Sequence, residues 1–222
     1  VAYNDFGSAM NALDGSDADS RTADSILDQL DIDSKELEEG REFLKWLGGY
    51  LDDEVTEYLS QEYGDWQTKM KAGRLPNYDM EIPLRNPKRP STDRLTEAAV
   101  AEGFNGKLWA KMGKLGRAVE MIHDRCNIDR QPAAEEVCEI VNRWYVENHE
   151  HFFREIELEH SPKEQALDSD LPWTEDYNGK LTLFNCIPSD KLATIFDQLG
   201  GGFVMSATLQ PMEVYTEVSG LD

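Results

Sequence analysis

The chain has 222 residues, of which 40% are hydrophobic, and its 44 acidic and 22 basic side chains give a formal net charge of −22 at pH 7. This length fits one large domain or two small ones, and the apolar fraction is sufficient for a packed core. No apolar run approaches the roughly 20 residues that span a bilayer, and residues 1–20 lack the basic start and apolar centre of a signal peptide, so we expect a cytoplasmic protein without a membrane segment.

The acidic residues are spread along the whole chain instead of forming a tail. Self-repulsion of this size destabilises a compact fold at ordinary ionic strength, whereas molar salt shortens the screening length to about 3 Å. The composition therefore indicates adaptation to a salt-rich cytoplasm, as in a halophilic prokaryote. An acidic surface that binds a basic partner is the alternative explanation.

The charge balance reverses between residues 69 and 117. Half of the basic residues, eleven of 22, lie in this window beside only five acidic ones. Phosphate contacts require Lys and Arg in no particular order, so the window predicts contact with nucleic acid; contact with an acidic neighbouring domain is the alternative. The phosphate-contact candidates are Arg85, Lys88, Arg89, Arg94, Lys107, Lys111 and Lys114.

The first two thirds of the chain have the apolar spacing of helices. Residues 1–21 are the exception, because they contain few large apolar side chains and predict a linker or a disordered start. Four prolines between residues 72 and 91 predict an extended basic connection. Helices capped at Ser34, and at Ser91 or Thr92, are expected together with others, over residues 34–59, 63–70, 92–101, 108–126 and 132–148.

The periodicity changes after residue 150. Ile156 and Leu158 alternate with glutamates, which predicts a half-exposed strand over residues 152–159. A second strand is expected over residues 179–188, then a helix from Ser189, a short strand at 203–205 and a helix from Pro211. The sequence therefore predicts an α+β fold in which a mainly helical subdomain is joined to part of an α/β domain.

The cysteines and histidines do not predict a metal centre. Cys126, Cys138 and Cys186 lie far apart without a C-x-x-C pair, so we expect buried, reduced thiols and neither a disulfide nor a zinc site. His149, His151 and His160 lie among glutamates, but solvated glutamates are expected throughout so acidic a chain, and we predict no metal ligands there.

The most specific pattern is the strand Phe203–Met205, which runs directly into Ser206-Ala207-Thr208-Leu209, with Pro211 just beyond. In open α/β sheets the carboxyl ends of strands face the ligand crevice, where small hydroxyl side chains can bond to a catalytic carboxylate. Together with residues 183–188 and Gly220-Leu221, this pattern resembles the end of the RecA-like first motor domain in XPD-like and DinG-like superfamily 2 DNA helicases. Ser206, Ala207 and Thr208 would be motif III of that family, with Ser206 and Thr208 linking the ATP site to movement on the DNA strand.

The resemblance also implies a division of the chain. In this family a mostly helical insertion, the arch domain, precedes the motif III segment, and residues 22–150 fit it in length, helicity and position. Residues 151–222 would be the C-terminal part of motor domain 1. The implied role is to enclose single-stranded DNA in an ATP-dependent helicase of DNA repair or related metabolism, expected to be a monomer whose partners are DNA, the other helicase domains and proteins that bind the arch. A non-enzymatic helical protein-interaction module is the alternative.

The chain departs from the family pattern in the groups that bind and cleave ATP. It contains no G-x-x-x-x-G-K-T phosphate cradle, no Asp-Glu-Ala-His box for Mg²⁺ and no set of four cysteines for the family's iron–sulfur cluster. ATP, Mg²⁺ and that cluster are therefore implied for the whole helicase only. We expect a fragment that holds no cofactor and no catalytic residue, and that does not hydrolyse ATP by itself.

Overall fold

A computed structural model describes residues 2–14, 18–86, 88–128, 133–147, 150–161, 171–186, 189–198 and 216. Its helices are α1 (Ala2–Leu13), α2 (Ala18–Gln29), α3 (Ser34–Tyr63), α4 (Trp66–Lys71), α5 (Arg94–Ala101), α6 (Gly106–Arg125), α7 (Ala134–Val146) and α8 (Ser189–Phe196), with a 3₁₀ helix η2 (Pro172–Glu175). Its strands are β1 (Met80–Pro83), β2 (Phe152–His160) and β3 (Tyr177–Asn185). The predicted α+β class is thereby confirmed.

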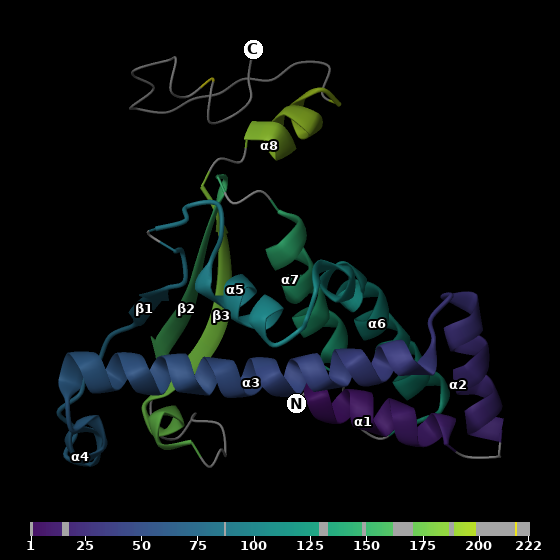
Figure 1. The fold of residues 1–222 in the computed structure, drawn as a ribbon, viewed down its shortest axis with the longest axis horizontal. Coiled ribbons are helices and arrows are strands. Elements are labelled where there is room, and N and C mark those ends of the chain that lie inside the picture. The colour runs from purple at the N-terminus through teal and green to yellow at the C-terminus, as the bar shows by residue number, and fades with distance from the viewer. Residues whose placement is uncertain are drawn as a thin grey trace.

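The long helix α3 runs across the molecule, with α1 and α6 packed against it, while α8 lies beyond the far end of the sheet (Figure 1). The N-cap of α3 is Asp33, one residue before the predicted N-cap Ser34. The Asp33 carboxylate accepts the backbone N–H of Lys35 at 3.0 Å, and the Glu36 carboxylate accepts that of Asp33 at 3.3 Å. Gly64, with φ of 63°, ends the helix and separates it from α4.

The prediction of a linker at residues 1–21 is wrong, since α1 and the start of α2 occupy most of this segment. Ala2, Phe6 and Ala9 are buried at positions i, i+4 and i+7 of α1. Phe6 reaches α3 at Gly40, where an added Cβ would lie 3.0 Å from the Phe6 ring. A stripe of alanines with one phenylalanine therefore gives close helix packing, although it lacks the large apolar residues on which the prediction relied.

Helices α6 and α7 approach closely at Gly116. A Cβ at this position would lie 2.7 Å from the Cys138 Cβ atom and 2.8 Å from the Ala134 carbonyl oxygen. At Gly113, one turn earlier on the same helix, the nearest atom would be the Cβ of Asn142 at an ordinary 3.7 Å. The packing of α6 against α7 therefore requires glycine at position 116 but not at position 113.

Alanine at Gly116 is therefore expected to lower the free energy of unfolding by about 1–3 kcal/mol through overpacking. Gly113→Ala is the matched control and should raise stability by up to about 1 kcal/mol, because alanine has the higher helix propensity. Urea unfolding at constant KCl measures both. Equal stabilisation by the two substitutions would contradict the close approach.

A carboxyl pair bridges α6 and α7 near this contact. A hydrogen bond with Glu135, with burial and the Glu135 charge adding to it, raises the pKa of Glu120 from 4.5 to about 7, and the same bond lowers the pKa of Glu135. The folded chain therefore binds more protons than the unfolded chain between about pH 4.5 and 7. The stabilisation from Glu120 is complete below pH 4.5 and is lost as the pH rises through about 7, whereas that from the lowered pKa of Glu135 is present above pH 4.5 and is lost as the pH falls below it.

Glu120→Gln should remove this pH dependence, because the amide donates the same hydrogen bond at every pH. Relative to the variant, the native chain is expected to lose about 1 kcal/mol between pH 5 and 8, a modest effect because solvent screens the pair. Thermal melts across this pH range at fixed KCl give the difference. A constant difference between the two melting temperatures would show that the carboxyls do not share a proton.

The sheet is antiparallel in the order β1-β2-β3. In its register Ile156 of β2 lies between Ile82 of β1 and Leu181 of β3. β2 and β3 agree with the predicted strands to within three residues at their ends. β1 was predicted only as part of an extended connection, and Pro83 ends it at the edge of the sheet, where a missing N–H is tolerated.

The strands share one core with the helices up to residue 185. β1 belongs to the predicted arch segment, yet it pairs with β2 beyond the expected boundary at 150/151. The Trp173 indole donates to Asp52 of α3 at 2.8 Å, and the Tyr177 hydroxyl donates to the Pro76 carbonyl at 2.7 Å. No gap in packing therefore marks that boundary. The expected strand at 203–205 and the helix from Pro211 lie outside the described residues.

Within the described residues, none of the helices combines the length and the hydropathy of a membrane-spanning segment. Cys126 and Cys138 are buried as predicted, whereas Cys186 is exposed. The prediction failed for Cys186 because this residue follows the last position of β3, where the chain has left the sheet.

Candidate nucleic-acid interface

The seven predicted phosphate-contact residues form two groups at different places along α3. Arg94 pairs with Glu54 of α3 at 3.0 Å, whereas the Lys111 ammonium pairs with Glu36 of the same helix. Eighteen residues separate these two carboxylates, which corresponds to about 27 Å along a helix. One group is a segment that we call the basic loop, residues 85–94, with Arg85, Lys88, Arg89 and Arg94. The other lies on the exposed face of α6 and consists of Lys107, Lys111 and Lys114.

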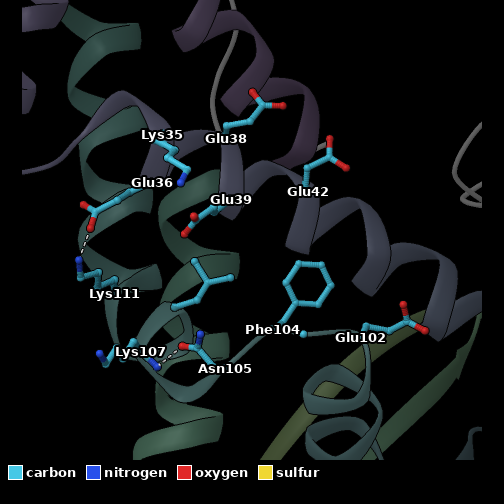
Figure 2. A pocket seen from close by; sticks show the side chains of 12 residues that line it. Lys35, Glu36, Glu38, Glu39, Glu42, Glu102, Phe104, Asn105, Lys107 and Lys111 are labelled. Atoms are coloured by element: carbon cyan, nitrogen blue, oxygen red, sulfur yellow. Dashed lines mark hydrogen bonds and ion pairs between the residues drawn. The ribbon is translucent and has the colours of Figure 1, made fainter.

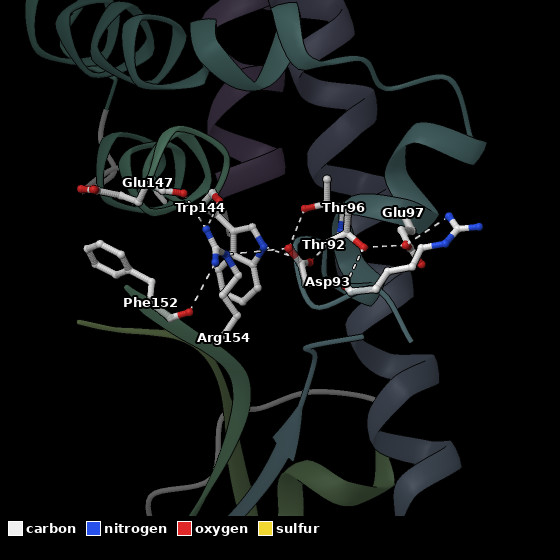
Figure 3. Close-up of polar contacts among 9 residues, drawn as sticks. Thr92, Asp93, Thr96, Glu97, Trp144, Glu147, Phe152 and Arg154 are labelled. Carbon is white, nitrogen blue, oxygen red and sulfur yellow. Dashed lines mark hydrogen bonds and ion pairs between the residues drawn. The ribbon is translucent and has the colours of Figure 1, made fainter. Parts of the chain in front are cut away.

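The basic loop is anchored by Asp93, whose residue surface is 1% exposed. Asp93 is the N-cap of α5: its carboxylate accepts the backbone N–H of Thr96 at 2.9 Å and the Thr96 hydroxyl at 2.8 Å. The Trp144 indole of α7 donates to the same carboxylate at 3.1 Å (Figure 3). One buried carboxylate thus joins the loop to two helices.

Arg154 of β2 completes this anchor as the counter-charge. Its Nε lies 3.8 Å from the Asp93 carboxylate, and both residues are almost fully buried. Its Nη2 donates to the carbonyl oxygens of Trp144 and Glu147, both at 2.9 Å. Burial lowers the pKa of Arg154, and the negative charge of Asp93 opposes that shift. The network therefore fixes the loop to the sheet and to the end of α7.

A second carboxylate, that of Glu97 in α5, binds side chains from both ends of the loop. It accepts the Thr92 hydroxyl at 2.6 Å and the Asn86 side-chain amide at 2.8 Å, and the Arg89 guanidinium lies 3.5 Å away. These donors, Thr92 first, lower the pKa of Glu97. The Asn86 side chain also accepts the backbone N–H of Lys88 at 2.9 Å. The loop is therefore organised by its own sequence before any ligand binds.

The organised loop presents three basic side chains to solvent. Arg85 and Lys88 are exposed and have no ion pair among the described residues, and the Arg89 side chain remains 72% exposed beside Glu97. Arg94 differs, because Glu54 and the Pro83 carbonyl hold its guanidinium. Arg85, Lys88 and Arg89 are consequently the members of the predicted set best placed to contact phosphate.

The loop lies at the end of the sheet from which the chain continues to Ser206-Ala207-Thr208. The backbone N–H of Leu84, just before the loop, donates to Arg154 at 3.0 Å. The backbone N–H of Cys186, just after β3, donates to the carbonyl oxygen of His151 at 2.8 Å. His151 lies three residues before Arg154, just ahead of β2. Ser206, Ala207 and Thr208 themselves lie outside the described residues.

Lys107 and Lys111 line a hollow of about 540 Å³ between α3 and the start of α6 (Figure 2). A hydrogen bond between Lys111 and Glu36 lowers the pKa of the carboxyl and raises that of the ammonium. Lys114 donates to the Asp31 carbonyl at 3.0 Å. More carboxylates than amines line the hollow. The carboxylates include those of Glu38, Glu39, Glu42 and Glu102. This second group is therefore less suited to phosphate than the basic loop.

Sequence reasoning missed the anchoring role of Asp93, Glu97 and Arg154. Asp93 with Thr96 has the spacing of an N-cap and its third helical residue, a signal that predicts the cap but not its burial. No local pattern connects Arg154 with Asp93, since 61 residues separate them. A metal site is not formed by the described residues, which contain no suitable group of three His, Cys, Asp or Glu side chains; His149 lies outside them.

Comparison with protein-family models, with curated proteins and with solved structures gives no match for this chain. The case for a function consequently depends on its own residues.

Proposed function

We propose that this chain is the arch domain and the end of the RecA-like first motor domain of an ATP-dependent, XPD-type DNA helicase, and that its basic loop contacts single-stranded DNA. The observation that carries the proposal is the sequence Gly202-Phe203-Val204-Met205-Ser206-Ala207-Thr208-Leu209, with Pro211 beyond it. It follows a strand and a helix, β3 and α8, in the order that the resemblance implies.

The geometry of the basic loop supports the DNA-binding part of the proposal. Three exposed cationic side chains lie on a loop that Asp93 and Glu97 fix. The loop backbone therefore loses little conformational entropy when these side chains bind phosphate. Side chains on such a loop contact the sugar–phosphate backbone without reading base sequence, as a helicase that moves along any strand requires.

The sheet supplies a connection between DNA contact and motif III in this proposal. β1 leads directly into the basic loop, and β3 leads toward α8 and the Ser-Ala-Thr element, while β2 hydrogen-bonds to both. A displacement of the loop by DNA would therefore act on the strand that precedes motif III. Ser206 and Thr208 would pass it on to an ATP site formed by parts of the helicase that this sequence does not contain.

The proposal is tested by titrating the purified chain into fluorescein-labelled oligo(dT) of 20 nucleotides in 0.5 M KCl and following anisotropy. We expect saturable binding, weaker binding to the corresponding duplex, and no DNA-stimulated ATP hydrolysis. The DNA-binding part fails if no binding occurs at any KCl concentration at which the chain is folded. A steady DNA-stimulated ATPase rate would overturn the assignment as a non-catalytic segment.

A further inference from the structure

The outer side of α3 forms a groove with α5 that the basic loop does not use. We call it the α3–α5 groove; its volume is about 780 Å³, and one face of α3 and the helix α5 line it. The ring of Trp46 stacks on that of Tyr50 at 5.4 Å between centroids and lies 5.4 Å from the ring of Phe104. These three aromatic residues are only partly buried and give the groove an apolar wall.

The α3 helix contains two adjacent glycines, Gly48 and Gly49, of which Gly49 lines the groove. An added Cβ at either position would meet no atom within 4 Å, so internal packing explains neither glycine. Glycine destabilises a helix interior relative to alanine. Ala98 and Ala101 of α5 also line the groove, whereas Gly48 does not. The small residues leave room for the backbone of a second molecule beside the aromatic wall.

The charge of the groove selects the kind of molecule. Glu42, Asp53 and Glu102 line it without an ion pair among the described residues, and Lys45 is the only basic residue that lines it. Carboxylates in this arrangement repel phosphate and attract Lys and Arg side chains, which also pack favourably on tryptophan and tyrosine rings. The segment of α3 from Glu42 to Asp53 is about 16 Å long, the length of a helix of eleven residues.

We propose that the α3–α5 groove binds a basic amphipathic helix of a partner protein. Its apolar face would lie on Trp46, Tyr50 and Phe104, its backbone would approach α3 at Gly49, and its Lys or Arg side chains would pair with the rim carboxylates. This is the helix-in-groove mode of recognition. The inference goes beyond the helicase assignment and does not depend on it.

The test uses a labelled 14-residue peptide with leucines at helical spacing flanked by lysines, a twin with glutamates in place of the lysines, and oligo(dT). Gly49→Leu fills the groove, and Gly48→Leu makes the same change on the adjacent residue outside it. Both variants should melt at a higher temperature than the native chain, because leucine favours the helix. In 1 M KCl, Gly49→Leu should weaken binding of the lysine peptide at least tenfold and Gly48→Leu less than twofold.

A second variant tests the charge requirement. Asp53→Lys combined with Glu102→Lys should weaken binding of the lysine peptide at least tenfold and leave the melting temperature unchanged or higher. The proposal is overturned if the lysine peptide binds Gly49→Leu as tightly as the native chain, or if the glutamate twin binds equally well. Displacement of the peptide by oligo(dT) would identify a nucleic-acid groove instead. If the chain fails to bind oligo(dT) but still binds the lysine peptide, the helicase assignment fails and the proposal for the α3–α5 groove stands.

Discussion

Replacing Asp93 with alanine is expected to lower the free energy of unfolding by about 3–5 kcal/mol, because the change leaves the buried charge of Arg154 without its partner. The cost includes more than the ion pair. The Trp144 indole loses its acceptor, and α5 loses the N-cap that accepts both donors of Thr96. Urea unfolding in 2 M KCl measures the change.

Asp65→Ala is the matched control, because Asp65 is also an N-cap aspartate but is exposed at the start of α4. Its loss should cost about 1 kcal/mol. Adding Arg154→Met to the Asp93→Ala chain should recover part of the lost stability, since the stranded charge is removed. If Asp93→Ala costs no more than Asp65→Ala, the buried pair does not have the energetic role that its geometry indicates.

Lowering KCl from 3 M to 10 mM is expected to lower the melting temperature by roughly 15 °C or more. The net charge of −22 is poorly screened at the lower concentration, where the screening length is about 30 Å against less than 3 Å in 3 M KCl. The structure adds a reason, since α3 brings many exposed acids onto one helix, among them Glu39, Glu42, Asp53 and Glu62.

Amide substitution of those four residues provides the control for this prediction. The neutralised chain should melt higher than the native chain in 10 mM KCl, and the two should converge in 3 M KCl, where screening leaves little repulsion to relieve. Circular dichroism melts at both concentrations are sufficient. A native melting temperature that is as high in 10 mM as in 3 M KCl would rule out the halophilic interpretation of the composition.

Helices and the two longer strands could be predicted because their signals are local. The N-caps were each predicted one or two residues from their true position for a physical reason: the segments Asp31–Ser34 and Ser91–Asp93 each offer several capping side chains. At α3 the local capping box of Asp33 with Glu36 decides the N-cap, whereas at α5 tertiary contacts decide it. For Asp93 the deciding contacts come from Trp144 and Arg154.

The elements that were missed depend on partners distant in the sequence. Phe6 packs α1 against α3 at Gly40, and β1 is a strand because β2, some 75 residues later, supplies its hydrogen bonds. Neither partner can be identified from the segment itself. The prolines of residues 72–91 therefore predicted an extended conformation but not the pairing of β1 with β2.

The candidate site was predictable as a composition but not as a surface. The basic window placed residues 85–94 in one predicted set with Lys107, Lys111 and Lys114, which the fold separates. Carboxylates from α3 decide which of these cations remain available, and their proximity is a property of the fold. Only the structure shows that Glu36 engages Lys111 and Glu54 engages Arg94, while Arg85 and Lys88 stay unpaired among the described residues.

The salt dependence of oligo(dT) binding tests the role of the basic loop most directly. Each phosphate contact with a single strand contributes about −0.7 to the slope of log K against log[KCl]. A chain with Arg85→Ala, Lys88→Ala and Arg89→Ala should therefore show a slope about 2 shallower than the native chain, together with weaker binding. Asp93 and Glu97 are retained in this variant, so the loop itself remains anchored.

A second triple variant, with alanine at Lys71, Arg74 and Arg125, removes the same charge from exposed positions elsewhere. Anisotropy titrations between 0.3 and 1.5 M KCl, over which the screening length falls from roughly 6 to 2.5 Å, compare both variants with the native chain. We predict that the slope of this control stays within about 0.5 of the native value while the loop variant loses about 2. Equal slopes for the two triple variants would contradict the assignment of DNA contact to the basic loop.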